Sequence, residues 1–215
     1  DASTKPLRAL HFPGNPVYEQ DAEVTRLVKA AVEALADSGV EIVEADDDEI
    51  IEDAFLTLMQ IVTADGAAWI RNLLEQLGTT EPHPWTKETL EALEGKGVSA
   101  EELLEAVDDW EEIRREMIET TRGYDLVVSP VVSTPTLPHG ELVNVETMPA
   151  YAPAMLHNIT GWPAVSVPVG LSSAGLPIGC QIAAKRWREA DCLHAAGLVE
   201  AKLGGWVPPL AGDRE

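Results

Sequence analysis

Two neighbouring stretches decide the fold: Asn158-Ile-Thr-Gly-Trp-Pro-Ala-Val-Ser-Val-Pro-Val-Gly170 and Gly175-Leu-Pro-Ile-Gly-Cys-Gln181. They contain two apolar runs, 164–169 and 178–183, each long enough for a strand, and the Gly-Leu-Pro sequence between them is typical of a turn. Prolines before and within the first run remove backbone hydrogen-bond donors, which predicts either a strand at the edge of a sheet or an interrupted strand end.

Outward from this segment, the chain alternates helical and strand patterns. Further strands are expected at 7–12, 40–45 and 126–129. Helices are expected at 21–39, at 49–77 with a possible break at Gly66, at 99–122 and at 189–202. Pro-rich loops are expected at 82–85 and 130–150. Helices interleaved with apolar strands indicate a layered α/β domain.

The chain is strongly acidic, with 37 acidic against 15 basic residues and a net charge of -22. Such a surface repels phosphate backbones and anionic lipid, so neither nucleic acid nor a membrane is expected as a partner. The short basic cluster Lys185, Arg186 and Arg188 is interpreted as a solvated connection between strand and helix. The sequence has no apolar run of about 20 residues and no signal-peptide pattern at its start, which favours a cytoplasmic location.

No side chains in the sequence form a recognisable catalytic or metal-binding pattern. Ser172 and Ser173 lie in a turn sequence without the glycines of an oxyanion loop. Lys96 is not expected to be a base, because no apolar strand precedes it that would bury and deprotonate its amine. The cysteines, Cys180 and Cys192, are expected to be buried and reduced. The five histidines of the sequence do not have the spacing of metal ligands; they are His11, His83, His139, His157 and His194. We therefore expect no catalytic residue, no metal and no cofactor within this chain.

The 158–181 segment, together with Tyr124-Asp-Leu-Val-Val-Ser-Pro130 upstream and a helix opening at Glu189, closely resembles the C-terminal block of the amidase signature family. The strand-helix-strand pattern at 7–45 resembles the segment that follows the family's catalytic core. The resemblance implies an α/β/α sandwich with a mixed sheet, in which residues 1–215 form the C-terminal part of a single domain with a helical insertion at about 49–122.

The resemblance also implies a reaction. Family members hydrolyse carboxylic amides through a serine nucleophile, a second serine in a cis peptide and an unprotonated lysine base, by way of an acyl-enzyme. Those residues lie N-terminal to everything in this sequence. We therefore expect the catalytic N-terminal part of the enzyme as partner and a small-molecule amide as substrate, and expect this chain alone to be inactive. A homodimer stays open.

On this interpretation the chain supplies part of the substrate pocket, and the candidate substrate-binding residues are Tyr151, Asn158, Trp162 and Gln181. In glutamine-using family members an aspartate is expected seven residues before the asparagine, and Tyr151 in its place favours a less polar amide. A packed core position is the alternative for Trp162. Two other functions stay open: a stand-alone, non-catalytic binding or assembly module, and a subunit of a glutamine-dependent aminoacyl-tRNA amidotransferase.

Overall fold

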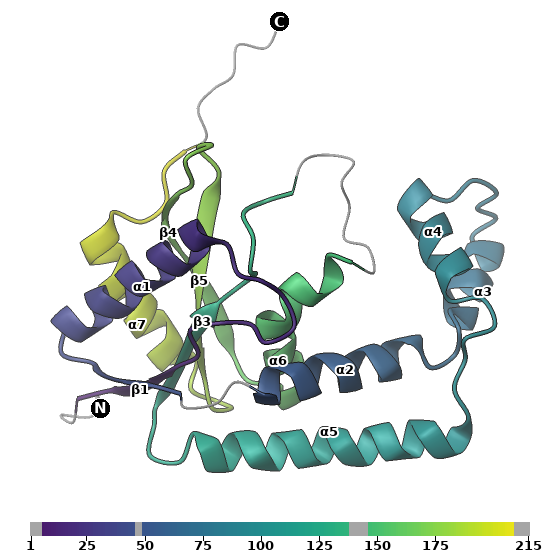
Figure 1. The fold of residues 1–215 in the computed structure, drawn as a ribbon, viewed down its shortest axis with the longest axis horizontal. Helices are drawn as coiled ribbons and strands as arrows, with labels where there is room; N and C mark the ends of the chain where they lie inside the picture. Colours follow the sequence, from purple (N-terminus) through teal and green to yellow (C-terminus); the bar gives the residue numbers. More distant parts are fainter. Residues whose placement is uncertain (1–5, 46–48, 138–145, 209–215) are drawn as a thin grey trace, which may run out of the picture.

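The computed structural model describes residues 6–45, 49–137 and 146–208, which contain a mixed sheet with the strand order β2-β1-β3-β5-β4 (Figure 1). β1 (Arg8–His11) lies between β2 (Glu41–Glu44) and β3 (Leu126–Pro130) and is parallel to both. β5 (Pro177–Ala184) runs antiparallel to β3 on one side and to β4 (Ala164–Leu171) on the other. The strands expected from the sequence are therefore all present.

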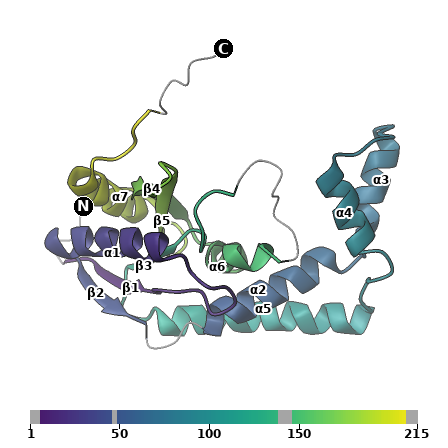
Figure 2. The ribbon, with the colours of Figure 1, turned by 45° about the horizontal axis from the view of Figure 1, so that its top comes forward.

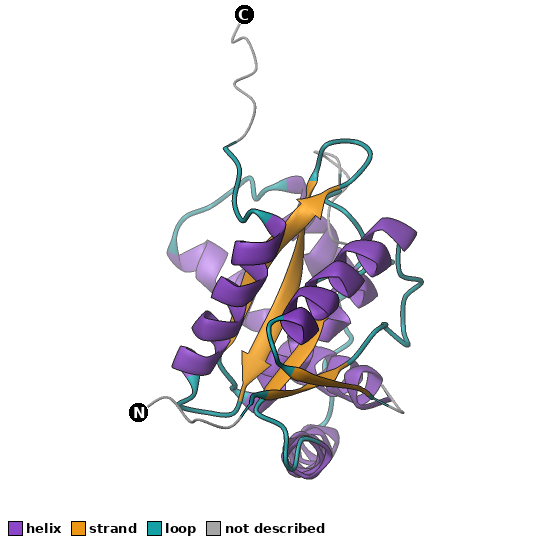
Figure 3. Ribbon diagram, turned by 90° about the vertical axis from the view of Figure 1, so that its left-hand side faces the viewer, coloured by secondary structure: helices purple, strands orange, loops and turns teal. Residues whose placement is uncertain are grey.

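Helices cover both faces of this sheet, as Figure 3 shows with the strands between two groups of helices. α1 (Ala22–Asp37) and α7 (Glu189–Leu203) pack on one face. α2 (Glu49–Thr63), α5 (Ala100–Thr120) and α6 (Ala152–Thr160) pack on the other. The expected layered α/β architecture with a mixed sheet is confirmed.

β5 is the strand on which both layers meet. Cys180, Ile182 and Ala184 belong to the apolar cluster formed with α1 and α7, whereas Ala183 belongs to the cluster on the opposite face. All four side chains are almost completely buried. Alternate residues of one strand therefore enter two cores, which explains why the sequence of β5 is nearly continuously apolar.

β4 is an edge strand among the described residues, as its prolines predicted. It pairs with β5 alone, and the pairing shifts register between Pro168 and Gly170, which marks a bulge. Ala164 and Ser166, which alternate with inward-facing valines, are exposed. The described residues thus leave the face of β4 that carries Ala164 and Ser166 exposed.

The segment between β2 and β3 is a long helical excursion. α2 and α5 lie side by side, and α3 (Ala68–Gln76) and α4 (Pro84–Ala92) stand at their far end (Figures 1 and 2). Gly66, at φ 60°, separates α2 from α3, so the expected break is confirmed. No described helix combines the length and apolar character needed to cross a bilayer.

One expectation was wrong, and one helix was not predicted. Residues 82–85 are not all loop, because Pro84 starts α4 and the His83 side chain accepts a hydrogen bond from the Trp85 amide as its N-cap. The expected loop 130–150 extends into a single 3₁₀ turn, η1 (Met148–Tyr151), and α6 follows it directly, a helix that the sequence did not indicate. Residues 138–145 of that loop lie outside the described residues.

Gly170 in the β4 bulge generates a stability prediction. Its φ is 143°, and a Cβ built there would lie 2.8 Å from Leu27 Cδ2 of α1. We expect Gly170→Ala to lower the free energy of unfolding by roughly 2 kcal/mol, through backbone strain and displacement of a buried leucine. Gly197→Ala in α7 is the matched control, since its added methyl group meets nothing within 4 Å. It should raise stability by about 0.5–1 kcal/mol. Urea titration measures both, and equal effects would contradict the assignment.

Candidate active-site surface

Loops from three parts of the chain meet beyond the carboxyl ends of β1 and β3. The Asn15 side-chain amide donates to Ser133 Oγ (2.8 Å) and to the Pro149 carbonyl (2.9 Å). The Asp21 amide donates to the Ser133 carbonyl (2.8 Å), and Ser133 is completely buried. These bonds fix η1 beside the strand ends, the region where α/β proteins commonly form ligand sites.

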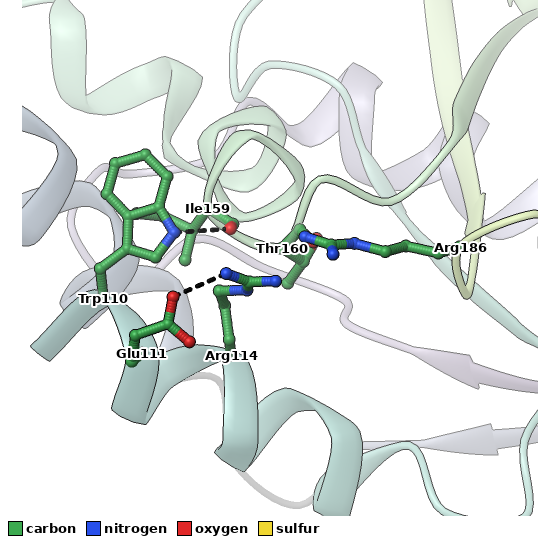
Figure 4. A network of polar contacts seen from close by, with 6 residues as sticks. All are labelled: Trp110, Glu111, Arg114, Ile159, Thr160 and Arg186. Atoms are coloured by element: carbon green, nitrogen blue, oxygen red, sulfur yellow. Dashed lines mark hydrogen bonds and ion pairs between the residues drawn. The ribbon is translucent and has the colours of Figure 1, made fainter. Parts of the chain in front are cut away.

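The helix that follows η1 is held at its other end by side chains from outside it (Figure 4). Trp110 Nε1 of α5 donates to the Ile159 carbonyl (2.9 Å), and Arg186 donates to the Thr160 carbonyl through Nε (3.3 Å) and Nη2 (3.1 Å). Gly161 ends the helix in the left-handed conformation. Carbonyls that a helix end leaves without partners are thus satisfied, and a cation lies at the negative end of the helix dipole.

The basic cluster lies in the connection between β5 and α7 with Arg186 and Arg188 exposed, as interpreted from the sequence, but its side chains also have structural roles. Lys185 Nζ donates to the Thr121 carbonyl (3.0 Å), which lies at the C-terminal end of α5. Arg186 stabilises the end of α6 in the same way, and Arg188 pairs with Asp191 in the first turn of α7. One connection between β5 and α7 anchors three helices.

The four candidate substrate-binding residues do not converge on one point. Gln181 is buried, and its side-chain amide donates to Ser129 Oγ (3.2 Å) and to the Pro153 carbonyl (3.3 Å), which ties β5 to α6. Tyr151 is half-buried at the start of α6, whereas Asn158 is exposed two turns further along. Trp162 is half-buried against the core that contains α2, α5 and α6, in agreement with the alternative of a packed tryptophan.

A cleft that the sequence analysis missed lies between α2, α4 and the segment before η1. Its volume is about 550 Å³, within the range of small-molecule sites. Phe55, Met59 and Thr63, spaced four residues apart, form one wall on α2. The second wall comes from α4 and its C-terminal end, with Trp85, Glu88, Thr89, Ala92 and Leu93. The third wall comes from the chain leading into η1, with Glu146 and Met148.

None of the four candidate residues lines this cleft, but Met148 and Tyr151 lie in the same 3₁₀ turn, η1. Two features of the sequence could have indicated the cleft. One is the apolar stripe at helical spacing on α2, and the other is the tryptophan in the first turn of α4. The cleft joins segments about 30 and 55 residues apart, which spacing along the sequence does not reveal.

The described serines and lysines have no nucleophilic arrangement that the hydrogen bonds of the structure support. Ser172 Oγ accepts from the Leu176 amide and Ser173 bonds Glu23 of α1, so both residues build a turn, as expected. Lys96 is exposed in the turn between α4 and α5. Burial raises the pKa of the Cys180 thiol to about 12 and that of Cys192 to about 11, so neither is a thiolate at neutral pH.

The described histidines likewise form no metal site, since no three His, Cys, Asp or Glu side chains converge within the described ranges. His139 lies outside those ranges. His157 is the unusual case: it is buried on α6, and neither ring nitrogen has a hydrogen-bond partner. Burial lowers the pKa of its imidazole to about 4, so it is neutral at physiological pH.

Comparison with known proteins identifies the family. The family described as Amidase matches residues 3–193, which is most of the chain. The chain belongs to the amidase family. Its fold matches that of 6-aminohexanoate cyclic dimer hydrolase in complex with substrate, with a TM-score of 0.72 and 25% identity over 93% of this chain and 46% of that one.

The curated relatives of this chain include fatty acid amide hydrolases and subunits of glutamyl-tRNA(Gln) amidotransferases. A fatty acid amide hydrolase from Medicago truncatula is 37% identical over 94 residues, which cover 40% of this chain and 16% of the relative. A subunit of the glutamyl-tRNA(Gln) amidotransferase from Exiguobacterium sibiricum is 35% identical over 100 residues, covering 45% and 20%. The matched segments thus span a fifth or less of the length of these relatives.

His157 generates a prediction on pH dependence. Its pKa is about 4 in the folded amidase chain and near the ordinary 6.5 when unfolded, so the unfolded state binds more protons between these values. The contribution to stability is complete above pH 6.5 and decreases as pH falls toward 4, by up to roughly 1 kcal/mol per pH unit. We expect His157→Phe to flatten the stability profile between pH 6.5 and 4.5, measured by urea titration at each pH.

His194→Gln, on an exposed residue of α7, is the control and should keep the wild-type slope. Parallel profiles for wild type and His157→Phe would contradict this account.

Proposed function

We propose that the chain is the substrate-facing C-terminal part of an amide hydrolase whose serine nucleophile, second serine and lysine base lie outside residues 1–215. The observation that carries the proposal is the match to the amidase family over 3–193, combined with a cleft of ligand size on a chain in which Ser129, Ser172 and Ser173 make structural hydrogen bonds. In this division of work, the chain completes the sheet and holds the substrate, and the other part performs the covalent chemistry.

Uncovered apolar surface supports a second part of the enzyme. Among the residues that the structure describes, β4 pairs on one side only, and its residues Ala164 and Ser166 are exposed on the face that carries α6. On α5 an exposed apolar stripe lies near one side of the helix and consists of Leu104 (67% exposed), Val107 (45%) and Ile118 (52%). Val107 and Ile118 follow Leu104 by three and fourteen residues. A sheet edge and an apolar helix face both favour packing against further polypeptide.

The mechanism assigns binding, not proton transfer, to this chain. The α2/α4 cleft holds the apolar arm of the amide and excludes water from it, while η1, fixed by Asn15 and Ser133, sets the position of the cleft rim relative to the strand ends. The serine of the other part attacks the amide carbonyl, the amine leaves with a proton, and water then hydrolyses the acyl-enzyme. Positioning of this kind contributes to rate by keeping the reacting groups in register.

Membership in a glutamine-dependent amidotransferase is the second candidate, favoured by the likeness to a glutamyl-tRNA(Gln) amidotransferase chain. Against it stands Tyr151, half-buried at the start of α6, where the resemblance would place an aspartate for the amino group of glutamine. The apolar lining of the cleft also favours a less polar amide than glutamine. A stand-alone binding module would use the same cleft without any hydrolysis.

The division of work predicts that purified residues 1–215 do not hydrolyse amides, because covalent acyl transfer needs a nucleophile and a base within hydrogen-bond reach. Release of ammonia or amine from a panel of aliphatic, aryl and glutamine amides measures this. In the complete protein, the double variant Ser172→Ala and Ser173→Ala should keep at least half of the wild-type turnover, since both hydroxyls stabilise a turn. Loss of turnover with an unchanged circular dichroism spectrum would contradict the turn assignment.

Tyr151 gives a prediction on specificity. We expect Tyr151→Ala in the complete protein to change the ratio of kcat/KM between aliphatic and aryl amides by roughly tenfold, because the ring lies in the same turn as the cleft residue Met148. Tyr18→Ala, at another half-buried tyrosine that lies outside η1, is the control. If both variants keep the wild-type ratio, Tyr151 is a packing residue and the argument against glutamine loses its support.

A further inference from the structure

The α2/α4 cleft combines an apolar floor with negative charge. Phe55 and Met59 supply the apolar surface, and Glu88 and Glu146 place two carboxylates in the lining. The described lining residues include no lysine, arginine or histidine. Trp85, 40% exposed, adds an aromatic ring at the same wall as Glu88. Carboxylates beside an indole are the groups that attract an organic ammonium ion, by Coulomb and cation–π interactions.

The walls of this cleft are braced from behind, so it exists before a ligand arrives. Arg71 of α3 donates to the Gly66 carbonyl (2.6 Å) and to the Leu90 carbonyl of α4 (3.0 Å). The backbone of Gly97 packs so tightly on Gly66 that a Cβ on Gly66 would lie 3.1 Å from the Gly97 nitrogen. The Val98 amide donates to the Ala64 carbonyl (2.9 Å). A preformed site loses less entropy on binding than one that must be ordered.

We propose that the α2/α4 cleft selects apolar organic cations, with the hydrocarbon against Phe55 and Met59 and the ammonium group at Glu88. This inference rests on the proposed function in one respect, which is that the bound cation is the arm of an amide substrate. The substrate class is then an amide with an apolar chain that carries an amine. The net charge of -22 favours the same selection, because it raises the local concentration of cations and repels fatty carboxylates.

Three probes of equal chain length separate charge from hydrophobicity: n-octylamine, n-octanol and n-octanoate. Titration calorimetry on residues 1–215 at pH 7 and low salt should show octylamine binding about tenfold more tightly than octanol, and octanoate most weakly. Glu88→Gln should remove most of the preference for octylamine while leaving octanol affinity unchanged. Glu91→Gln, at an exposed position further along the same helix, makes the same charge change outside the lining and should keep the preference.

A second variant locates the probe. Ala92→Lys puts a long cationic side chain into the cleft on a helix-forming residue, and should abolish octylamine binding with an unchanged far-ultraviolet circular dichroism spectrum. Equal affinity for octylamine and octanol, or equal effects of Glu88→Gln and Glu91→Gln, would overturn the inference.

Hydrolysis by the complete protein distinguishes this inference from the function on which it rests. We expect 8-aminooctanamide to be hydrolysed with about tenfold higher kcat/KM than octanamide, and Glu88→Gln to remove the difference. Charge-selective binding without hydrolysis of either amide would support the cleft specificity and overturn the proposed function. Hydrolysis of both amides at one rate, with no charge preference in binding, would overturn the cleft specificity and leave the hydrolase in place.

Discussion

The connection between β5 and α7 supplies the interaction on which the arrangement of the helical layer depends. Lys185 and Arg186 leave the end of β5 and donate to the terminal carbonyls of α5 and α6. Helix ends carry carbonyls without internal partners, and leaving them buried and unpaired is costly. Because β5 also contributes alternate side chains to both cores, two adjacent cations fix the helices to a strand that both cores share.

This anchoring reaches the candidate site through α6. The helix is held at its C-terminal end by Trp110 and Arg186, and at its N-terminal end by Gln181 and the η1 turn that precedes it. Met148 of η1 lines the cleft, so the position of one wall follows from contacts on the sheet. The other two walls, on α2 and α4, are fixed by the excursion itself.

How far the sequence predicts this structure depends on whether an element is stabilised locally. β3, β5 and the β4 edge followed from apolar runs and from prolines, because burial on two faces and loss of donors leave direct marks in the sequence. α6 was missed because the short segment 152–160 ends in Asn-Ile-Thr, residues of low helix propensity, and the carbonyls at its C-terminal end are satisfied by residues 49 and 26 positions away. α4 was not predicted, because its N-cap is His83, not Ser, Thr, Asp or Asn.

The candidate site was less predictable than the sheet for a related reason. Its cleft lies on α2, α4 and the η1 approach, and neither α3 nor α4 contains a buried residue. Side chains of such helices contribute little to the core, so substitutions in the α4 wall of the cleft should cost little folding free energy. The sheet and its anchoring cations carry the opposite constraint, since each change there removes a buried contact or leaves a carbonyl unpaired. The strands of this amidase chain therefore carry the sequence signal of the family, whereas the α4 side of the proposed cleft consists of helical residues whose pattern resembles that of any solvated helix.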